Sequence, residues 1–380
     1  MKSKLPHIGT TIFAVMSALA NEHGAINLSQ GFPNFDPPQA LRDLVMKYMN
    51  QGMNQYAPMP GVPALRKIIA EKIHSLYGLE VDPETEITVT SGGTQALFTA
   101  IAALIGPGDE AILVEPAYDS YGPAIEVQGG VAVSYELAAP DYRVDWARLE
   151  QLVTPRTRMI IVNTPHNPTG KTFTAADLHA LEQIAERHDL WVLSDEVYEH
   201  LIFDGRKHES VFWYPKLYSR SLAVFSFGKT FHNTGWKMGY CVAPPYLMKE
   251  FRKVHQFNVF SANTPIQHAL AEFLQRPEEY LGLPAFYQQK RDYFLQAIAG
   301  SGLRPIPCEG TYFQLADYSP VSDLPDFEFC QWLTREIGVA AIPVSSFYVH
   351  KRDEKVLRFC FGKTEELLER AGEKLRGLSS

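Results

Sequence analysis

The stretch VFSFGKTFHNTGWKMGY, residues 224–240, begins as an apolar run and continues with a lysine, Lys229, just after the run ends. A short apolar run rich in valine and phenylalanine is typical of a buried strand. Lysine is mostly exposed in proteins, so Lys229 is either a side chain that extends to solvent or an amine held out of water. A desolvated amine has a lowered pKa, which suits Schiff-base chemistry. The stretch therefore indicates a reactive site at the end of a strand.

Strand and helix patterns alternate on the N-terminal side of this stretch. Residues 64–78 place apolar side chains on one helical face and end in Gly78, and Thr174 with Asp177 forms a capping box before another helical pattern. Strands that alternate with helices predict a mostly parallel sheet covered on both faces, which is an α/β fold. The expected strands are 86–93, which runs into a turn, 110–116, 157–165, 190–196, 221–227 and 238–244.

The pattern changes after Pro284. A long amphipathic helix is followed by a strand over 310–318, a helix over 327–338 and a charged helix from Thr364. This order predicts a smaller α+β domain. The expected domains are a large domain, 40–285, and a small domain with an N-terminal arm, 1–39 and 286–380.

The composition points to a soluble protein with a small-molecule partner. The 380 residues carry a formal net charge of -8 and no block of lysine and arginine, which argues against a nucleic-acid partner. No apolar stretch is long enough to span a membrane. The four cysteines form no Cys-x-x-Cys pair, so neither a zinc site nor a redox dithiol is indicated, and reduced thiols in a cytoplasm are expected. They are Cys241, Cys308, Cys330 and Cys360.

Polar or glycine-rich segments follow four of the expected strands. Ligands of open parallel sheets bind beyond the carboxyl ends of the strands, so we expect these segments to meet at one crevice. Backbone N–H groups of Gly92, Gly93 and Thr94, where a helix begins, would hold a phosphate there. A plain tight turn is the alternative explanation of the same glycines. The four segments are 90–94, 163–170, 194–198 and 226–229.

Together these motifs resemble the class I aminotransferases that depend on pyridoxal phosphate, a family with the fold called fold type I. SFGKTFHNTGWKMG (226–239) is similar to the family's cofactor-lysine motif. NTPHNPTG (163–170), SDEVYEHL (194–201) and LSQGFPNFDPP (28–38) match the family in order and approximate spacing. The resemblance covers essentially the whole chain. Within the family it is strongest to the kynurenine aminotransferase-like branch, and there to the bacterial methionine aminotransferases.

The resemblance implies pyridoxal 5'-phosphate as the cofactor. Lys229 would hold it covalently and, once displaced by the substrate amine, would be the base that moves a proton. Asp195 would pair with the pyridine nitrogen, and Asn167 and Tyr198 would hydrogen-bond the phenolic oxygen of the ring. From the residues alone, Asp195 is equally well explained as a helix cap, and tyrosines commonly serve in aromatic packing. The other implied contacts are Tyr118 on the ring face, Gly92, Gly93, Thr94, Ser226 and Lys237 at the phosphate, and Tyr56 from a neighbouring subunit.

Two further residues concern the substrate. Arg358 in VLRFCFG resembles the family's α-carboxylate arginine, whose planar fork suits bidentate binding, although a structural ion pair is the alternative. Gly31 resembles the glycine whose backbone approaches that carboxylate. One position departs from the family, because Lys237 stands where arginine is usual. A lysine still neutralises phosphate but gives less geometric control.

The substrate is expected to have an uncharged side chain. An acidic side chain would require a second cation, and residues 255–265 offer aromatic rings and amides but no cation. We therefore expect methionine and other uncharged or aromatic amino acids as amino donors and a 2-oxo acid as acceptor. The resemblance also implies a homodimer, because Tyr56 would have to cross a two-fold interface.

Other functions stay open at this stage. A carbon-sulfur β-lyase acting on cysteine conjugates would use the same cofactor, Lys229 and Asp195. A non-catalytic regulator that binds the cofactor would usually carry an appended DNA-binding module. A metal hydrolase is disfavoured, because His200 with Glu196 and Glu199 does not form a His-Glu-x-x-His pair, and no metal is expected.

Overall fold

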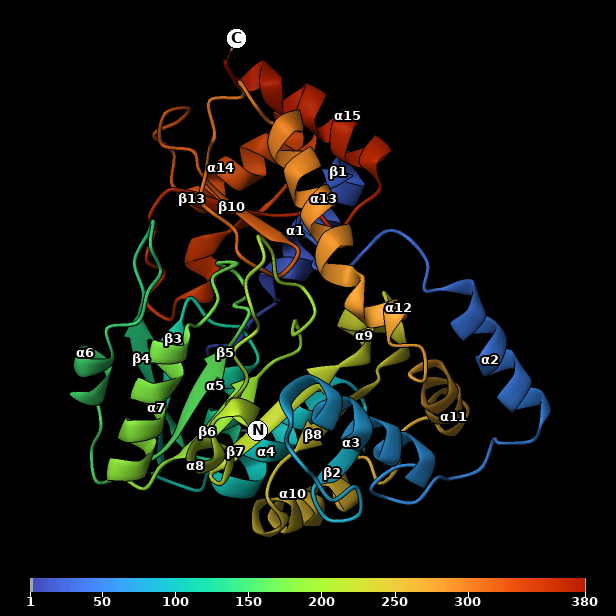
Figure 1. Ribbon diagram of the computed structural model, residues 1–380. Coiled ribbons are helices and arrows are strands. Elements are labelled where there is room, and N and C mark those ends of the chain that lie inside the picture. Colours follow the sequence, from blue (N-terminus) through green and yellow to red (C-terminus); the bar gives the residue numbers. More distant parts are fainter. Residues whose placement is uncertain (1–2, 380) are drawn as a thin grey trace.

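The computed structural model, which describes residues 3–379, has a seven-stranded sheet at its centre, in the order β2-β8-β7-β6-β5-β3-β4 (Figure 1). β8 is antiparallel to both neighbours and every other pair is parallel, so the predicted mostly parallel sheet is confirmed. Residues 1–2 and 380, which belong to the expected small domain with its N-terminal arm, lie outside the described residues. The strands are β2 (Ile87–Thr90), β3 (Glu110–Glu115), β4 (Val131–Glu136), β5 (Thr157–Asn163), β6 (Trp191–Asp195), β7 (Ser221–Ser226) and β8 (Gly239–Val242).

Helices cover both faces of this sheet, as predicted. Alternate side chains of a strand point to opposite faces. In β5, Met159 and Ile161 pack in one hydrophobic cluster with α4 (Gly93–Leu104) and α10 (Pro245–Asn258). Ile160 and Val162 pack in the other cluster, which includes side chains of α7 (Ala175–Arg187) and α8 (Pro215–Tyr218). The sheet is therefore buried on both sides, which explains its continuous apolar runs.

β4 is the one strand of this sheet that the sequence analysis does not predict. It lies at the edge, beside β3, and its first residue, Val131, is exposed. Only Tyr135 in this strand is fully buried. A half-covered edge strand lacks the continuous apolar run that marks the central strands.

A second, antiparallel sheet lies against the edge of the first where the central strands end (Figure 1). Its order is β12-β13-β10-β9, and a two-stranded parallel pair, β1 with β11, attaches the N-terminal segment to this C-terminal part. The strands are β1 (Ile26–Asn27), β9 (Arg304–Pro305), β10 (Phe313–Asp317), β11 (Val339–Ala340), β12 (Ile342–Pro343) and β13 (Val356–Cys360). The helices around them are α1 (Ile12–Glu22), α13 (Leu283–Ala297), α14 (Asp326–Trp332) and α15 (Glu365–Arg376).

The helix boundaries follow local sequence signals. α3 (Pro63–Tyr77) ends at Gly78, whose φ of +69° suits glycine. α7 begins with the predicted capping box: the Thr174 hydroxyl accepts from the Asp177 N–H at 3.3 Å, and the Asp177 carboxylate accepts from the Thr174 N–H at 2.7 Å. None of the described helices has the length and apolar character needed to cross a membrane.

The remaining helices connect these parts. They are α2 (Gln39–Asn50), α5 (Tyr121–Val127), α6 (Trp146–Glu150), α9 (Phe227–Thr230), α11 (Thr264–Phe273) and α12 (Glu278–Leu281). The short 3-10 helices are η1 (Val211–Trp213), η2 (Thr234–Trp236), η4 (Val344–Phe347) and η5 (Gly377–Ser379), and η3 (Leu333–Ile337) is a π-helix that extends α14.

Candidate active site

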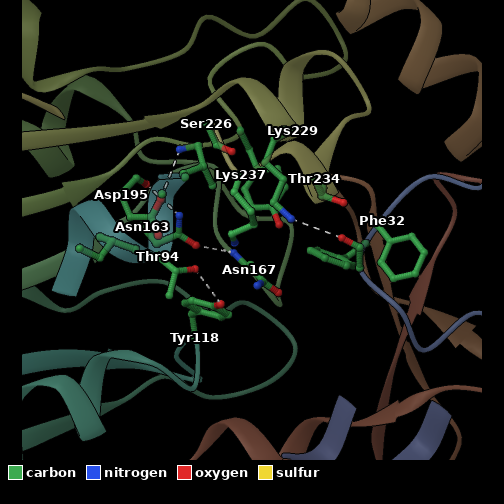
Figure 2. A pocket seen from close by; sticks show the side chains of 18 of the residues that line it. Phe32, Thr94, Tyr118, Asn163, Asn167, Asp195, Ser226, Lys229, Thr234 and Lys237 are labelled. Atoms are coloured by element: carbon green, nitrogen blue, oxygen red, sulfur yellow. Dashed lines mark hydrogen bonds between the residues drawn. The ribbon is translucent and has the colours of Figure 1, made fainter. Parts of the chain in front are cut away.

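A cavity of about 220 Å³ lies at the carboxyl edge of the central sheet. Segments from the ends of β2, β5, β6 and β7 line it, together with Gly31 of the N-terminal segment and Arg358 of β13. Figure 2 shows side chains from these elements pointing toward one another. The sequence-predicted residues that line the cavity are Gly31, Gly92, Gly93, Thr94, Tyr118, Asn167, Asp195, Tyr198, Ser226, Lys229, Lys237 and Arg358.

Lys229 lies on the short helix α9, directly after β7. Its Nζ donates to the Tyr312 hydroxyl at 2.9 Å and to the Gly31 carbonyl at 3.3 Å. Withdrawal from water lowers the pKa of Lys229 to about 8. The uncharged amine is therefore populated closer to neutral pH than in an exposed lysine. The sequence signal, a lysine at the mouth of a buried strand, thus corresponds to a partly neutral amine that faces a cavity.

Asp195 is the last residue of β6. Its carboxylate accepts from the Tyr121 hydroxyl at 2.6 Å and from the Val197 N–H at 3.3 Å. Burial raises the pKa of Asp195 to about 6, although both hydrogen bonds act in the opposite direction. Burial disfavours the charged carboxylate, so a cationic ligand beside Asp195 would restore its charged form.

Two asparagines connect β5 to the residues around it. The Asn163 side chain donates to the Asp195 carbonyl at 2.8 Å and accepts from the Asn167 N–H at 2.7 Å. The Asn167 side-chain oxygen in turn accepts from Nη1 of Arg358 at 2.8 Å. Asn167 is therefore held from two directions with its amide at the cavity wall (Figure 2).

Arg358 is almost fully buried, with 1% of its surface exposed. Its Nη2 donates to the Ser29 carbonyl at 3.0 Å, and its guanidinium carbon lies 3.9 Å from the centre of the Phe313 ring. Burial lowers the pKa of Arg358 to about 10, so it stays charged at neutral pH. Its buried Nε has no hydrogen-bond partner, and no carboxylate pairs with it among the residues described. A charged guanidinium without a carboxylate partner is prepared to bind an anion.

The segment between β2 and α4 forms a second anion-binding feature. The first-turn N–H groups of α4 have no partner within the helix and carry the positive end of its dipole. Gly92 has a φ of +83°, and a Cβ there would lie 3.5 Å from the amine of Lys237. Thr94 and Tyr118 share a hydrogen bond of 3.2 Å at the same edge (Figure 2). Ser226 completes the polar lining.

Tyr56 is the one predicted site residue that does not line the cavity. Its side chain is 83% exposed, and its ring lies 5.4 Å from that of Phe260. It lines a separate surface groove with Asn263 and Thr264, so part of the stretch 255–265 also lies there and not at the cavity of its own chain.

Sequence reasoning missed two polar residues of this site. Tyr121 donates to Asp195, and Tyr312 contacts Lys229. Neither shows a local signal, because its partner is distant in the chain. Asn163, which bridges two segments, lies in the predicted polar segment 163–170, although no role was assigned to it. No group of three His, Cys, Asp or Glu side chains within residues 3–379 is arranged to hold a metal ion.

The fold and the cavity define an α/β protein with a desolvated lysine amine, a buried carboxyl, a buried guanidinium and a helix N-terminus at the carboxyl edge of its sheet. Residues 23–375 match the family model described as aminotransferase class I and II, and the chain belongs to this family. It is therefore an aminotransferase with the predicted fold type I architecture.

Individual relatives cover nearly the whole chain. The chain is 54% identical to methionine aminotransferase of Escherichia coli (strain K12), over 99% of this chain and 98% of that protein. It is 37% identical to kynurenine–oxoglutarate transaminase 1 of Mus musculus, over 94% and 92%. The crystal structure of YbdL from Escherichia coli, reported with a methionine aminotransferase function, superimposes with a TM-score of 0.97 at 54% identity and covers 99% of both chains.

Proposed function

We propose that this aminotransferase holds pyridoxal 5'-phosphate at Lys229 and moves the amino group of methionine, and of other uncharged or aromatic amino acids, to a 2-oxo acid in two half-reactions. The observation that carries the proposal is that two side chains with shifted pKa values line the same cavity. Lys229 has a lowered pKa and Asp195 a raised one. Groups whose environments shift their pKa values in this way are characteristic of acid–base sites.

The residues of the cavity fit this cofactor. When bound, pyridoxal phosphate acts as an electron sink that stabilises negative charge at the substrate's Cα. A protonated ring nitrogen would meet Asp195, whose buried carboxyl lacks a cationic partner. The N–H groups of Gly93 and Thr94 at the start of α4, with Lys237 beside Gly92, suit a phosphate.

Other lining residues suit the rest of the ring. Asn167 and Tyr198 would hydrogen-bond its phenolic oxygen, Tyr118 would stack on its face, and Ser226 would bind the phosphate with Gly92. Tyr198 is buried, and burial raises the pKa of its hydroxyl far above the ordinary value, so it remains a hydrogen-bond donor at neutral pH.

Arg358 would bind the substrate and Lys229 would transfer its proton. Arg358 would bind the α-carboxylate through its fork, next to the backbone of Gly31, and orient the Cα–H bond. Nζ of Lys229, free after the substrate amine has displaced it, would take the proton from Cα and pass it to the C4′ carbon of the cofactor. A lysine pKa of about 8 suits both directions of this transfer near neutral pH.

The lining of the cavity supports an uncharged substrate side chain. Among the described residues, the basic groups at the cavity are Lys229, Lys237 and Arg358, each of which already has a proposed role. Within residues 3–379, no further lysine or arginine lines the cavity to meet an acidic side chain. Phe13, Phe32 and Leu97 contribute apolar surface. The relative from Escherichia coli that is called a methionine aminotransferase gives independent support.

The assembly and location are proposed with the function. We place the enzyme in the cytoplasm, in agreement with its four free, buried cysteines. We also propose that it is a homodimer. We also retain the division into a large domain, 40–285, and a small domain with the N-terminal arm, 1–39 and 286–380.

The test is the visible absorption spectrum of the purified protein. We expect a cofactor band that is lost on addition of methionine and returns with a 2-oxo acid. Lys229→Ala should fold normally, with an unchanged far-ultraviolet circular dichroism spectrum, and lose turnover. Normal transamination by Lys229→Ala would refute the assignment. A higher kcat/KM for aspartate than for methionine would refute the substrate class.

The same experiment separates the alternatives. A carbon-sulfur β-lyase would release pyruvate from a cysteine conjugate without consuming a 2-oxo acid. A non-catalytic regulator would keep its band when methionine and the 2-oxo acid are added.

A further inference from the structure

Tyr312 is a buried tyrosine in contact with Lys229 that none of the roles above uses. Its hydroxyl lies 2.9 Å from Nζ of Lys229 and 2.7 Å from the Gly31 carbonyl oxygen. A carbonyl can only accept, so the Tyr312 hydroxyl donates its proton to Gly31. Its lone pairs then face the lysine, and the hydroxyl accepts from Nζ.

These contacts fix the direction of the Lys229 amine. Nζ has four tetrahedral positions: one is the bond to Cε, and two are N–H groups that donate to Tyr312 and Gly31. The fourth is a lone pair in the neutral amine and an N–H in the ammonium ion. We infer that Tyr312, together with the Gly31 carbonyl, is a positioning residue that aims this fourth position of Nζ at the substrate after Lys229 has been displaced.

The backbone around Tyr312 is built to hold its hydroxyl in place. Thr311 has a φ of +68°, which is a rare conformation for a β-branched residue. A Cβ on Gly310 would lie 2.7 Å from the Leu201 carbonyl oxygen, so the turn packs tightly against the segment after Tyr198. Residues in such strained conformations persist where the surrounding structure determines them and are concentrated at functional sites.

Ring packing leaves Tyr312 no freedom to turn away. The side chain is fully buried, and its ring meets those of Tyr198, Phe313 and Tyr287 at centroid distances of 5.4, 4.9 and 5.9 Å. The hydroxyl is thus carried on a rigid aromatic support.

The inference rests on the proposed function, since it assumes that Lys229 moves the proton. A neutral Nζ accepts the proton from Cα, becomes an ammonium ion with three N–H groups, and keeps two of them on Tyr312 and Gly31. The third N–H is the one that would then give the proton to the C4′ carbon of the cofactor, which leaves Nζ neutral again. No other proton donor or acceptor is needed, and charge balances because the proton and its positive charge travel together on Nζ.

The main experiment compares Tyr312→Phe with Tyr287→Phe. Tyr287 is equally buried and packs on Tyr312, but its hydroxyl bonds to His232 at 2.9 Å and does not contact Lys229, so it is the matched control. With the cofactor bound, we expect Tyr312→Phe to slow the half-reaction with methionine about tenfold or more, with KM little changed. The isotope effect with α-deuterated methionine should rise, because proton transfer then limits the rate.

A second readout uses the cofactor-free protein. The rate at which an amine-acylating reagent modifies Lys229, followed by peptide mass spectrometry across a pH series, gives the midpoint of its titration. Removing a neutral acceptor destabilises the ammonium ion, so Tyr312→Phe should lower this midpoint by about one pH unit. Tyr287→Phe should leave it in place. The other titratable groups that face Lys229 are present in both variants: Asp195, Tyr198, Lys237, Arg358 and Cys360. Among them, Tyr198 loses a hydrogen-bond partner in Tyr312→Phe, because the two tyrosine hydroxyls are in contact.

The outcomes are distinct. If the wild-type protein shows no cofactor band, the proposed function fails. If the wild type transaminates and both Tyr312→Phe readouts equal those of the wild type, the inference about Tyr312 alone is overturned. Should Tyr312→Phe not fold, Tyr312→Met also removes the hydroxyl while keeping apolar bulk, and the same slower half-reaction and lower midpoint are expected of it.

Discussion

Asp195 offers a test at the scale of a single residue that needs no turnover. Its pKa is raised to about 6 in the folded protein against an ordinary value of 3.8, so between these values the folded state binds more protons than the unfolded state. The free energy of unfolding therefore falls as pH rises through this window. The full difference corresponds to at most about 3 kcal/mol.

Asp195→Asn should remove this pH-dependent fall in the free energy of unfolding. In the cofactor-free protein, the free energy of unfolding of the variant minus that of the wild type should rise between about pH 4 and pH 6 and then level off. Taking the difference matters, because burial also raises the pKa of Asp326 to about 6 and that residue titrates in both proteins. Denaturant unfolding of both proteins across the pH range measures this difference in the free energy of unfolding. A flat difference curve would show that Asp195 is not the perturbed group.

Prediction from the sequence also succeeds and fails at this scale for a physical reason. A lysine at the end of an apolar strand is unusual for its residue type, and glycines before a helix are a known turn signal. Both can be recognised from the neighbouring residues in the sequence. The contact of Arg358 with Asn167 joins residues that are 191 positions apart, and that of Tyr312 with Lys229 joins residues 83 apart. Such contacts depend on how the sheets pack, which no local pattern specifies.

At the scale of elements, β13 and the residues after it hold the N-terminal segment against the cavity. The N–H of Cys360 donates to the Leu28 carbonyl at 2.8 Å, and the buried Lys363 donates through Nζ to the carbonyls of Phe32 at 2.7 Å and Gln30 at 3.4 Å. Gly31, whose carbonyl contacts Lys229, lies between these two carbonyls. A lysine outside the cavity therefore fixes one of its walls.

Lys363→Met should loosen that wall while keeping the length of the side chain. Two carbonyls lose their donor, so we expect the protein to be about 1–3 kcal/mol less stable and the KM for methionine to rise several-fold, with a smaller change in kcat. Lys374→Met is the control. Lys374 is an exposed residue of α15 that does not line the cavity, and its Nζ donates to the Ile337 carbonyl at 3.4 Å. An unchanged KM in Lys363→Met, measured by steady-state kinetics, would count against this account.

Elements differ in how well sequence predicts them. The central strands and α7 were predicted because burial on both faces and a capping box leave clear patterns. The two-residue strands β1 and β11 were not, since they are too short to have a pattern. β4 was not, because an edge strand is only half covered. Their existence depends on neighbours supplied by other parts of the chain.

At the scale of the whole molecule, the proposed homodimer can be tested through Tyr56. Tyr56 is 83% exposed and lines a groove apart from the cavity of its own chain. The exposed Met49 lines the same groove, and the exposed Phe260 contacts the Tyr56 ring. Exposed apolar side chains gathered in this way suit an interface between copies of the chain. A sequence can suggest Tyr56 only by resemblance, since a contact between chains leaves no local pattern.

Subunit mixing tests whether Tyr56 serves the partner's cavity. In a mixed dimer of Lys229→Ala and Tyr56→Ala chains, one cavity has an intact Lys229 from the second chain. If Tyr56 acts across the interface, that cavity also receives an intact Tyr56 from the first chain and is fully functional. If Tyr56 acts within its own chain, the same cavity lacks it. The two models therefore differ in one functional cavity per mixed dimer.

We expect each variant alone to be impaired and the mixture, unfolded and refolded together or co-expressed, to gain activity toward half of the wild-type value per mixed dimer. The measurement is methionine transamination by mixed dimers isolated with two different affinity tags. A mixture of Lys229→Ala with wild-type chains is the control, because its mixed dimers hold one functional cavity in either model. Activity per mixed dimer of about half that of the impaired Tyr56→Ala dimer would place Tyr56 in the function of its own chain. An unimpaired Tyr56→Ala dimer would show that Tyr56 has no role. When Tyr56→Ala alone is impaired, recovery of the mixture to the level of the control requires that the cavity at Lys229 is completed by a residue of the second subunit.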